Sequence, residues 1–296
     1  MKLTDAGLET VLIFEDGFEL PQFAAFPLVD SEEGRAALRR YYGGFLELAR
    51  DRDVPLVLSA PTWRASADWG RLLGYEGEDL AAVNRRAVEF VQTMSAVHDD
   101  VVVEGSIGPR SDAYRPTLVM DVAEAESYHA VQLRTLADTG CTQATALTLT
   151  YVDEAVGIVR AATTVGLPVH VGFTVETDGR LPSGDSIEDA ILAVDAATDG
   201  AAESFFINCA HPTHFADALP EGDSRTRIRG LRANASTLSH AELDEAEELD
   251  AGDPHDLAAR YVALQRDLPA LEVVGGCCGT DIRHVTAICD AWLAAG

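Results

Sequence analysis

Basic residues are scarce in this chain of 296 residues, and lysine is almost absent. Lys2 is the only lysine, the other basic residues are arginines, and the formal net charge at pH 7 is −27. Such a surface repels nucleic acid and anionic membranes, so neither is expected as a partner. Two explanations of the charge stay open: solubility or a GC-rich genome, and adaptation to high salt, where screening relieves self-repulsion.

Long apolar runs and export signals are also missing. No apolar stretch reaches the length of about 18 residues that a membrane-spanning helix needs, so no such helix is expected. Residues 1–5 lack the basic and apolar pattern of a signal peptide. A cytoplasmic location is therefore expected.

The cysteine content excludes a disulfide framework. An odd number of cysteines in a chain without an export signal favours metal binding or catalysis instead. Cys141 lies just before a predicted strand and Cys289 within the last predicted helix, so both are expected to be small buried apolar residues. The five cysteines are Cys141, Cys209, Cys277, Cys278 and Cys289.

No glycine-rich phosphate-binding fingerprint follows an early strand, which argues against a doubly wound nucleotide-binding sheet. Instead, β-rich apolar runs alternate with helical patterns. Eight strands alternating with eight helices predict an α/β fold, a single (β/α)8 TIM barrel, with residues 1–296 as one domain. Strands are expected near 2–5, 55–60, 101–105, 143–149, 168–174, 204–209, 227–233 and 271–276, and helices near 32–52, 79–98, 121–139, 153–165, 186–198, 212–219, 254–267 and 281–294.

Local signals mark several helix ends. Asp121 with Glu124 forms the sequence pattern of a capping box. Ser186 and Asp281 stand where N-caps are expected, and Gly166 stands where a helix should stop, as does Gly140. The longest irregular segments, near 10–30, 61–78, 105–120, 174–185 and 233–253, mostly begin at the carboxyl end of a strand, where barrels keep their active sites.

The most informative segment is Gly-Gly-Cys-Cys-Gly-Thr at 275–280, directly after an apolar run. Cys209 ends another apolar run, so a barrel would bring it to the same face as Cys277 and Cys278. Three thiolates suit Zn²⁺ and leave a fourth position open for a substrate. A thiol bound there would be held as a thiolate, able to attack an electrophilic carbon. The alternative is that these cysteines are only small buried residues.

Several segments resemble the homocysteine S-methyltransferase family, and together they cover nearly the whole chain. The resemblance implies that Cys209, Cys277 and Cys278 bind zinc and that a thiol receives a methyl group from a sulfonium, ammonium or folate donor. The predicted substrate site includes Asp5, Gly7, Thr62, Arg64, Glu104 and Asn208; of these, Arg64 lies in a loop that departs from the family pattern and suits an acceptor with less positive or more negative charge, or is only a packing arginine. The segments are Asp-Ala-Gly-Leu-Glu-Thr (5–10), Ser-Ala-Pro-Thr-Trp-Arg-Ala-Ser (59–66), Gly-Ser-Ile-Gly-Pro (105–109), Ser-Gly-Asp-Ser (183–186), Ile-Asn-Cys (207–209) and 275–280.

One departure from the family pattern bears on the acceptor. After the fourth strand the family carries Glu-Thr, whose glutamate holds the amino group of homocysteine; the matching dipeptide here is Leu147-Thr148. Leucine cannot pair with an ammonium group. Three explanations stay open: the alignment is shifted, another acid such as Glu104 or Glu9 takes over, or the acceptor is not homocysteine.

The sequence thus predicts a zinc-dependent S-methyltransferase that moves a methyl group from a small sulfonium or betaine donor to a thiol, with homocysteine as the first expected acceptor and methionine as product. Only sixteen residues follow Thr280, so folate or cobalamin domains are not expected. Two alternatives stay open: the same zinc chemistry on another pair of substrates, and a non-catalytic zinc-binding barrel. The expected partners are a small-molecule thiol and a methyl donor. The oligomeric state is left open, a homo-oligomer included.

Overall fold

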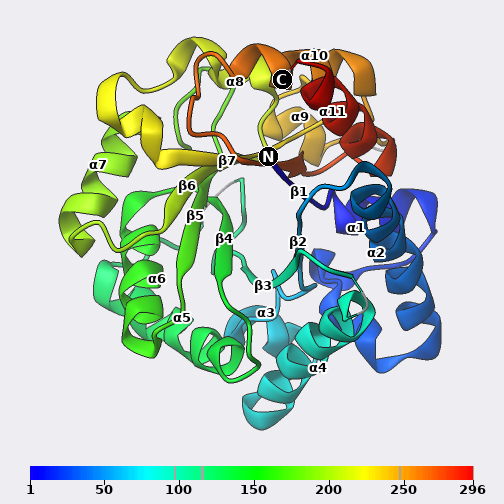
Figure 1. The fold of residues 1–296 in the computed structure, drawn as a ribbon. Helices are drawn as coiled ribbons and strands as arrows, with labels where there is room; N and C mark the ends of the chain where they lie inside the picture. Colours follow the sequence, from blue (N-terminus) through cyan, green and yellow to red (C-terminus); the bar gives the residue numbers. More distant parts are fainter. Residues whose placement is uncertain (97, 115–116, 247, 296) are drawn as a thin grey trace.

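The predicted strands form a closed parallel barrel in the computed structural model, which describes residues 1–96, 98–114, 117–246 and 248–295 (Figure 1). Each strand pairs with the next one in sequence, and the barrel closes where Leu3 lies opposite both Leu56 of the second strand and Val274 of the last. The predicted (β/α)8 TIM barrel is therefore confirmed. The strands are β1 (Lys2–Thr4), β2 (Leu56–Ser59), β3 (Val101–Ile107), β4 (Ala144–Leu149), β5 (Val169–Phe173), β6 (Ser204–Asn208), β7 (Ile228–Ala233) and β8 (Val273–Gly276).

The helices surround the barrel, and the eight predicted ones are all found. They are α2 (Glu32–Arg52), α4 (Gly77–Ser95), α5 (Val122–Ala137), α6 (Val152–Val165), α7 (Ile187–Thr198), α8 (Pro212–Phe215), α10 (Pro254–Leu264) and α11 (Ile282–Ala295). Of these, α8 is shorter than predicted, because the chain continues as the 3-10 turn η4 (Ala216–Ala218).

Some segments predicted to be irregular contain short helices. Two of them, α3 (Ala67–Leu72) and α9 (His240–Asp244), lie in the loops after β2 and β7, while α1 (Leu8–Thr10) and the π-helical turn η1 (Val11–Glu15) follow β1. These loops therefore have regular structure next to the site described below. The remaining 3-10 turns are η2 (Pro21–Phe23), η3 (Phe26–Asp30) and η5 (Gly222–Arg227).

Three of the predicted helix ends, at Asp121, Ser186 and Gly166, are confirmed, whereas α5 ends at Ala137 with Asp138 as its C-cap, short of the predicted Gly140. The Asp121 carboxylate accepts a hydrogen bond from the backbone N–H of Glu124 at 2.9 Å, and the Glu124 carboxylate accepts one from the Asp121 N–H at 3.3 Å, which completes the capping box. Ser186 caps α7 through the N–H of Asp189 at 3.0 Å. Gly166 ends α6 in the left-handed conformation that glycine adopts without strain.

The core fills the barrel and the layer between strands and helices. Helix α2 shows why: Leu38, Tyr42 and Phe45 recur at helical spacing and are all buried, and the Tyr42 hydroxyl donates to the Ser59 carbonyl at 2.9 Å. Cys141 and Cys289 are buried in this core, as predicted.

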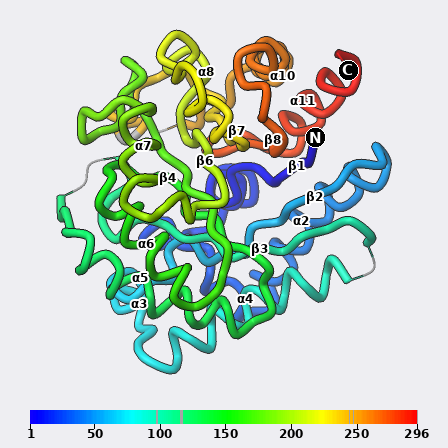
Figure 2. The backbone as a smooth tube through the Cα atoms, turned by 60° about the vertical axis from the view of Figure 1, so that its left-hand side comes forward, coloured from blue at the N-terminus to red at the C-terminus, as the bar shows by residue number. Residues whose placement is uncertain are grey.

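Figure 2 shows the amino-terminal strand beside α11, near the carboxyl end. No described helix combines the length and apolar character that crossing a membrane requires.

Candidate metal centre

Three cysteines meet at the carboxyl-terminal end of the barrel. Cys209 follows β6 directly, and Cys277 and Cys278 follow β8. Their Sγ atoms all lie within 4.8 Å of one another, and those of Cys209 and Cys278 are 3.6 Å apart. In the described part of the chain, no other group of three cysteine, histidine or acidic side chains is arranged to share a metal ion. The fold thus brings together residues that are far apart in the sequence.

Backbone segments pack closely against one another around the cysteines. A Cβ on Gly7 would lie 2.5 Å from the carbonyl oxygen of Cys277, so only glycine fits against this turn. The same carbonyl accepts a hydrogen bond from the Thr280 hydroxyl at 2.6 Å. Cys209 has a left-handed backbone (φ 55°), which is unusual outside glycine and is typical of functional sites. These constraints point the sulfurs toward one another.

Polar groups surround the Cys209 sulfur. The Tyr114 hydroxyl lies 3.0 Å from Sγ, and the Asn234 side-chain oxygen lies 3.2 Å from it. The Tyr114 ring stacks on His240, with ring centroids 4.0 Å apart, and His240 Nε2 lies 3.0 Å from the Cys209 carbonyl. The sequence did not single out these three residues, because they come from the loops after β3 and β7, far from Cys209 along the chain.

The three cysteines shift one another's pKa values. Hydrogen bonds from Cys209 and then Cys278 lower the pKa of Cys277, and the guanidinium of Arg232 lowers it further. The hydrogen bond to Cys277 raises the pKa of Cys209, and those to Cys209 and Cys277 raise the pKa of Cys278. Three cysteine sulfurs this close together are a donor set that fits Zn²⁺.

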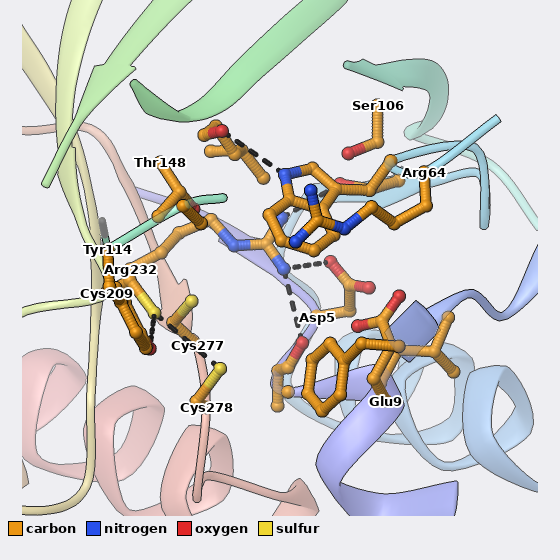
Figure 3. Close-up of a pocket in the computed structure, with 18 of the residues that line it drawn as sticks. Asp5, Glu9, Arg64, Ser106, Tyr114, Thr148, Cys209, Arg232, Cys277 and Cys278 are labelled. Carbon is orange, nitrogen blue, oxygen red and sulfur yellow. Dashed lines mark hydrogen bonds and ion pairs between the residues drawn. The ribbon is translucent and has the colours of Figure 1, made fainter. Parts of the chain in front are cut away.

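A cavity of about 250 Å³ lies beside the three cysteines (Figure 3). Of the predicted substrate residues, Asp5, Gly7 and Arg64 line it. Much of the remaining wall is apolar, with Trp63 and Leu147 among its residues. The Trp63 indole donates to the Leu147 carbonyl at 3.2 Å, which ties the loop after β2 to β4. The cavity can hold only a small molecule.

Thr62 and Asn208 do not line the cavity, although both are close to it. The Thr62 hydroxyl donates to the Ser106 carbonyl at 2.8 Å and accepts from its N–H at 3.0 Å. The Asn208 amide accepts from the Thr148 N–H at 2.9 Å and donates to the Thr148 hydroxyl at 2.8 Å. Thr62 therefore ties the loop after β2 to β3, and Asn208 ties β6 to β4, two strands away.

Glu104 does not line the cavity either. It is buried, and its carboxylate accepts hydrogen bonds from the Ser59 hydroxyl at 3.0 Å, the Gln143 amide at 2.8 Å and the Thr145 hydroxyl at 2.7 Å. With both carboxylate oxygens bound inside the barrel, Glu104 is not placed to receive an ammonium group from the cavity.

Asp5 faces a partner that the sequence did not reveal. Its carboxylate forms a buried ion pair with Arg232 at 2.8 Å. Burial raises the pKa of Asp5, and Arg232 opposes that rise. The guanidinium of Arg232 also donates hydrogen bonds to neighbouring protein groups. Nε donates to the Gly276 carbonyl, Nη1 to the Thr4 and Ser59 hydroxyls, and Nη2 to the Ala6 carbonyl.

Leu147 reaches the cavity because β4 is irregular at this point. The register of β4 against β5 shifts between Ala146 and Leu149, and Thr148 has a left-handed backbone (φ 64°). Of the two acids considered as replacements for the family glutamate, only Glu9 lines the cavity. Burial, and then the nearby Cys277 and Asp5, raise the pKa of Glu9 to about 7.

Three other histidines lie near strand ends, His170, His211 and His214, and their hydrogen bonds go to groups other than the cysteines. His211 caps α8, and burial lowers its pKa to about 4. His170 bonds to the Ser204 hydroxyl at 2.8 Å, and His214 to the Thr237 carbonyl at 2.9 Å. Among the described histidines, His240 is the one that contacts a cysteine, through the carbonyl of Cys209.

The comparisons with known proteins agree with this architecture. The family model described as homocysteine S-methyltransferase matches residues 3–292. The metallated form of the homocysteine methyltransferase MmuM from Escherichia coli is 18% identical, with a TM-score of 0.75, over 98% of this chain and 96% of that one. Its oxidized form is 17% identical, with a TM-score of 0.76, over 97% and 94%. No curated protein matches the chain by sequence.

Proposed function

The chain belongs to the homocysteine S-methyltransferase family and is a thiol methyltransferase, and from this premise we propose a zinc-dependent enzyme that moves a methyl group from a small sulfonium or betaine donor to homocysteine, giving methionine. The observation that carries the proposal is the convergence of three cysteine Sγ atoms within 4.8 Å beside the cavity. The metallated form of the Escherichia coli homocysteine methyltransferase supports it. One catalytic domain over residues 1–296 and a cytoplasmic location belong to the same proposal.

Each part of the site has a role in this proposal. Cys209, Cys277 and Cys278 would hold the ion, and bound zinc supplies the positive charge that keeps a substrate thiol deprotonated at neutral pH. Tyr114 and Asn234 orient the Cys209 sulfur through their hydrogen bonds. The apolar walls exclude water, and the small cavity aligns thiol and donor, which lowers the entropic part of the barrier.

Metal analysis of the purified protein tests the first step. We expect stoichiometric zinc in the wild type, loss of most of it in Cys277→Ser, and loss of methyl transfer in parallel. Cys141→Ala is the matched control, because Cys141 is buried away from the cavity and should leave both quantities unchanged. Absence of zinc from the wild type, or unchanged zinc in Cys277→Ser, would contradict the proposal.

A second candidate acceptor is a thiol without an amino group. It is favoured by the position of Leu147 in the cavity wall, by the pairing of Asp5 with Arg232, and by the internal hydrogen bonds of Glu104. None of these gives an ammonium group a ready partner. A comparison of kcat/KM for homocysteine and 4-mercaptobutanoate, which differs only in lacking the amino group, separates the two candidates. A preference for homocysteine above about tenfold, lost in Glu9→Gln, would identify Glu9 as the ammonium partner and reject this candidate.

A further inference from the structure

Arg64 is a buried cation in the cavity wall, and its guanidinium makes few hydrogen bonds to the described residues. The residue is 6% exposed and lines the cavity. Its guanidinium lies between two indole rings, 4.2 Å from the Trp63 centroid and 3.8 Å from the Trp69 centroid. These two cation–π contacts hold the guanidinium in place and leave its N–H groups for hydrogen bonds.

Those N–H groups have few partners. Nη1 donates to the Ser111 carbonyl at 3.2 Å, and buried Nε has no hydrogen-bond partner among the residues that the structure describes. None of the ion pairs that the described residues form with one another includes Arg64, in contrast to Arg232, which is paired with Asp5 at 2.8 Å. Burial lowers the pKa of Arg64 to about 10, while Asp112 and Glu9 oppose the change, so the group remains charged at neutral pH.

A buried charge without a direct counter-ion is costly, and the cost falls when a ligand supplies the counter-ion. The guanidinium fork matches a carboxylate, which it can bind through two parallel hydrogen bonds. In Figure 3 the cysteine sulfurs lie on one side of the cavity, and Arg64 lies on the other side with Ser106. A molecule with its reacting group at the cysteine sulfurs and an anionic group at its far end would place that anionic group beside Arg64.

We propose that Arg64 is the residue that selects a carboxylate-bearing substrate in this cavity. The proposal rests on the proposed function and deepens it by naming the substrate class. The carboxylate belongs either to the acceptor, as in a mercapto acid, or to the methyl donor, as in a betaine or an amino-acid sulfonium. Either source makes the same contact with Arg64, and the experiment separates them.

The test for the acceptor uses two thiols of nearly equal shape, 4-mercaptobutanoate and its neutral amide. Binding is measured without turnover, by titrating each thiol into protein loaded with Co²⁺ and following the sulfur-to-metal absorption band. We expect the carboxylate to bind about tenfold to a hundredfold more tightly in the wild type. In Arg64→Met this advantage should disappear while the affinity for the amide stays the same, because methionine keeps the apolar length between the indoles.

The second arm addresses the donor. KM is measured for glycine betaine and for its methyl ester, and for S-methylmethionine and its amide, with the wild type and Arg64→Met. If the carboxylate of the donor is the ligand of Arg64, the variant loses the preference among donors and keeps the preference among thiols. Arg64→Lys should retain part of the preference in whichever arm shows it, because it keeps the charge without the fork.

Arg71→Met is the matched control. Arg71 lies on the same short helix as Trp69, is exposed, and does not line the cavity. The substitution therefore removes one positive charge without changing the cavity. Thermal unfolding and metal content confirm that each variant is folded and loaded. If Arg64→Met preserves the carboxylate preference in both arms, or if the wild type shows none, the proposal is wrong. Absence of methyl transfer from every donor would reject the proposed function instead, since the cobalt titration still reports on Arg64.

Discussion

Gly7 is the residue at which the first loop of the barrel meets the cysteine turn. A Cβ at this position would lie 2.5 Å from both the Cys277 carbonyl oxygen and the Thr10 hydroxyl, so Gly7→Ala must displace the backbone that carries a predicted metal ligand. We expect the free energy of unfolding to fall by about 1–3 kcal/mol. We also expect zinc affinity to fall, measured by competition with a chromophoric chelator.

Gly43→Ala is the control for that prediction. Gly43 lies within α2 and has no atom within 4 Å of an added Cβ. Alanine in a helix interior should stabilise the protein by about 0.5–1 kcal/mol and leave zinc affinity unchanged. Equal effects of the two substitutions on zinc affinity would show that contact with the Cys277 carbonyl is irrelevant to metal binding.

Glu9 gives the metal-free protein a pH dependence with a definite sign. Its ordinary pKa of 4.5 is raised to about 7 in the folded chain, so between these values the folded state retains a proton that the unfolded state releases. The contribution of Glu9 to stability therefore declines as the pH rises through that window. Glu9→Gln should become progressively more stable than the wild type from pH 4.5 to 7, measured by urea unfolding in the presence of a chelator. Glu33→Gln, an exposed residue of α2, should show no such trend.

At the scale of elements, Asp281 connects the cysteine turn to α11. Its carboxylate accepts a hydrogen bond from the Arg283 backbone N–H at 2.7 Å, as the sequence predicted for a helix cap, and lies 3.1 Å from His284 Nδ1. Burial alone would raise the pKa of Asp281, but hydrogen bonds from His284 and Arg283 outweigh it and lower the pKa. This carboxylate thus stabilises the fold when it is ionised.

Asp281→Ala should reduce the free energy of unfolding by about 1–2 kcal/mol at neutral pH. Because the folded pKa is lowered, the loss should be present above the unfolded pKa of about 3.9 and shrink as the pH falls below it. Asp121→Ala removes the cap of α5 away from the cysteines and is the control for the loss of a helix cap in general. A destabilisation of Asp281→Ala that stays constant down to pH 2 would contradict the role assigned to the ionised carboxylate.

The barrel could be predicted from the sequence because its elements carry strong local signals. Buried strands such as β6 appear as short apolar runs, and helices appear as longer periodic patterns, with the capping box of Asp121 marking the start of α5. The short helices α3 and α9 were not predicted, since a segment of one or two turns has too few residues to establish a period. Their formation depends on packing against the rest of the barrel.

The candidate site was predictable only in part, for a related reason. Cys277 and Cys278 form a local motif, and the barrel topology supplies Cys209. The surroundings, in contrast, depend on which side chains meet when the barrel closes. Tyr114 reaches Cys209 from the loop after β3, and Arg232 on β7 reaches past β8 to Asp5 after β1. No spacing in the sequence encodes these contacts, and substrate residues inferred from resemblance alone included Thr62, which the fold uses internally.

At the scale of the whole molecule, the net charge of −27 has a consequence for stability. With few basic residues to offset them, the acidic side chains repel one another in the compact state, and added salt screens this repulsion. If the surface is adapted to high salt, the midpoint of thermal unfolding should rise by several degrees between 0.1 and 2 M KCl. An unchanged midpoint would favour the alternative, in which the charge reflects solubility or genome composition.

The rise of the unfolding midpoint through charge screening must be separated from the general strengthening of hydrophobic interactions by salts. Three exposed helix glutamates that form no ion pair among the described residues, Glu33, Glu47 and Glu89, can be replaced together by glutamine. The triple variant removes part of the repulsion and leaves the core unchanged, so its midpoint should be higher than that of the wild type in low salt, with a smaller gain in KCl. Sodium sulfate acts mainly through exclusion from the protein surface, and at matched ionic strength it should add a similar further increment in both proteins. If the two proteins gain equally in KCl, self-repulsion of the surface is not what the salt relieves.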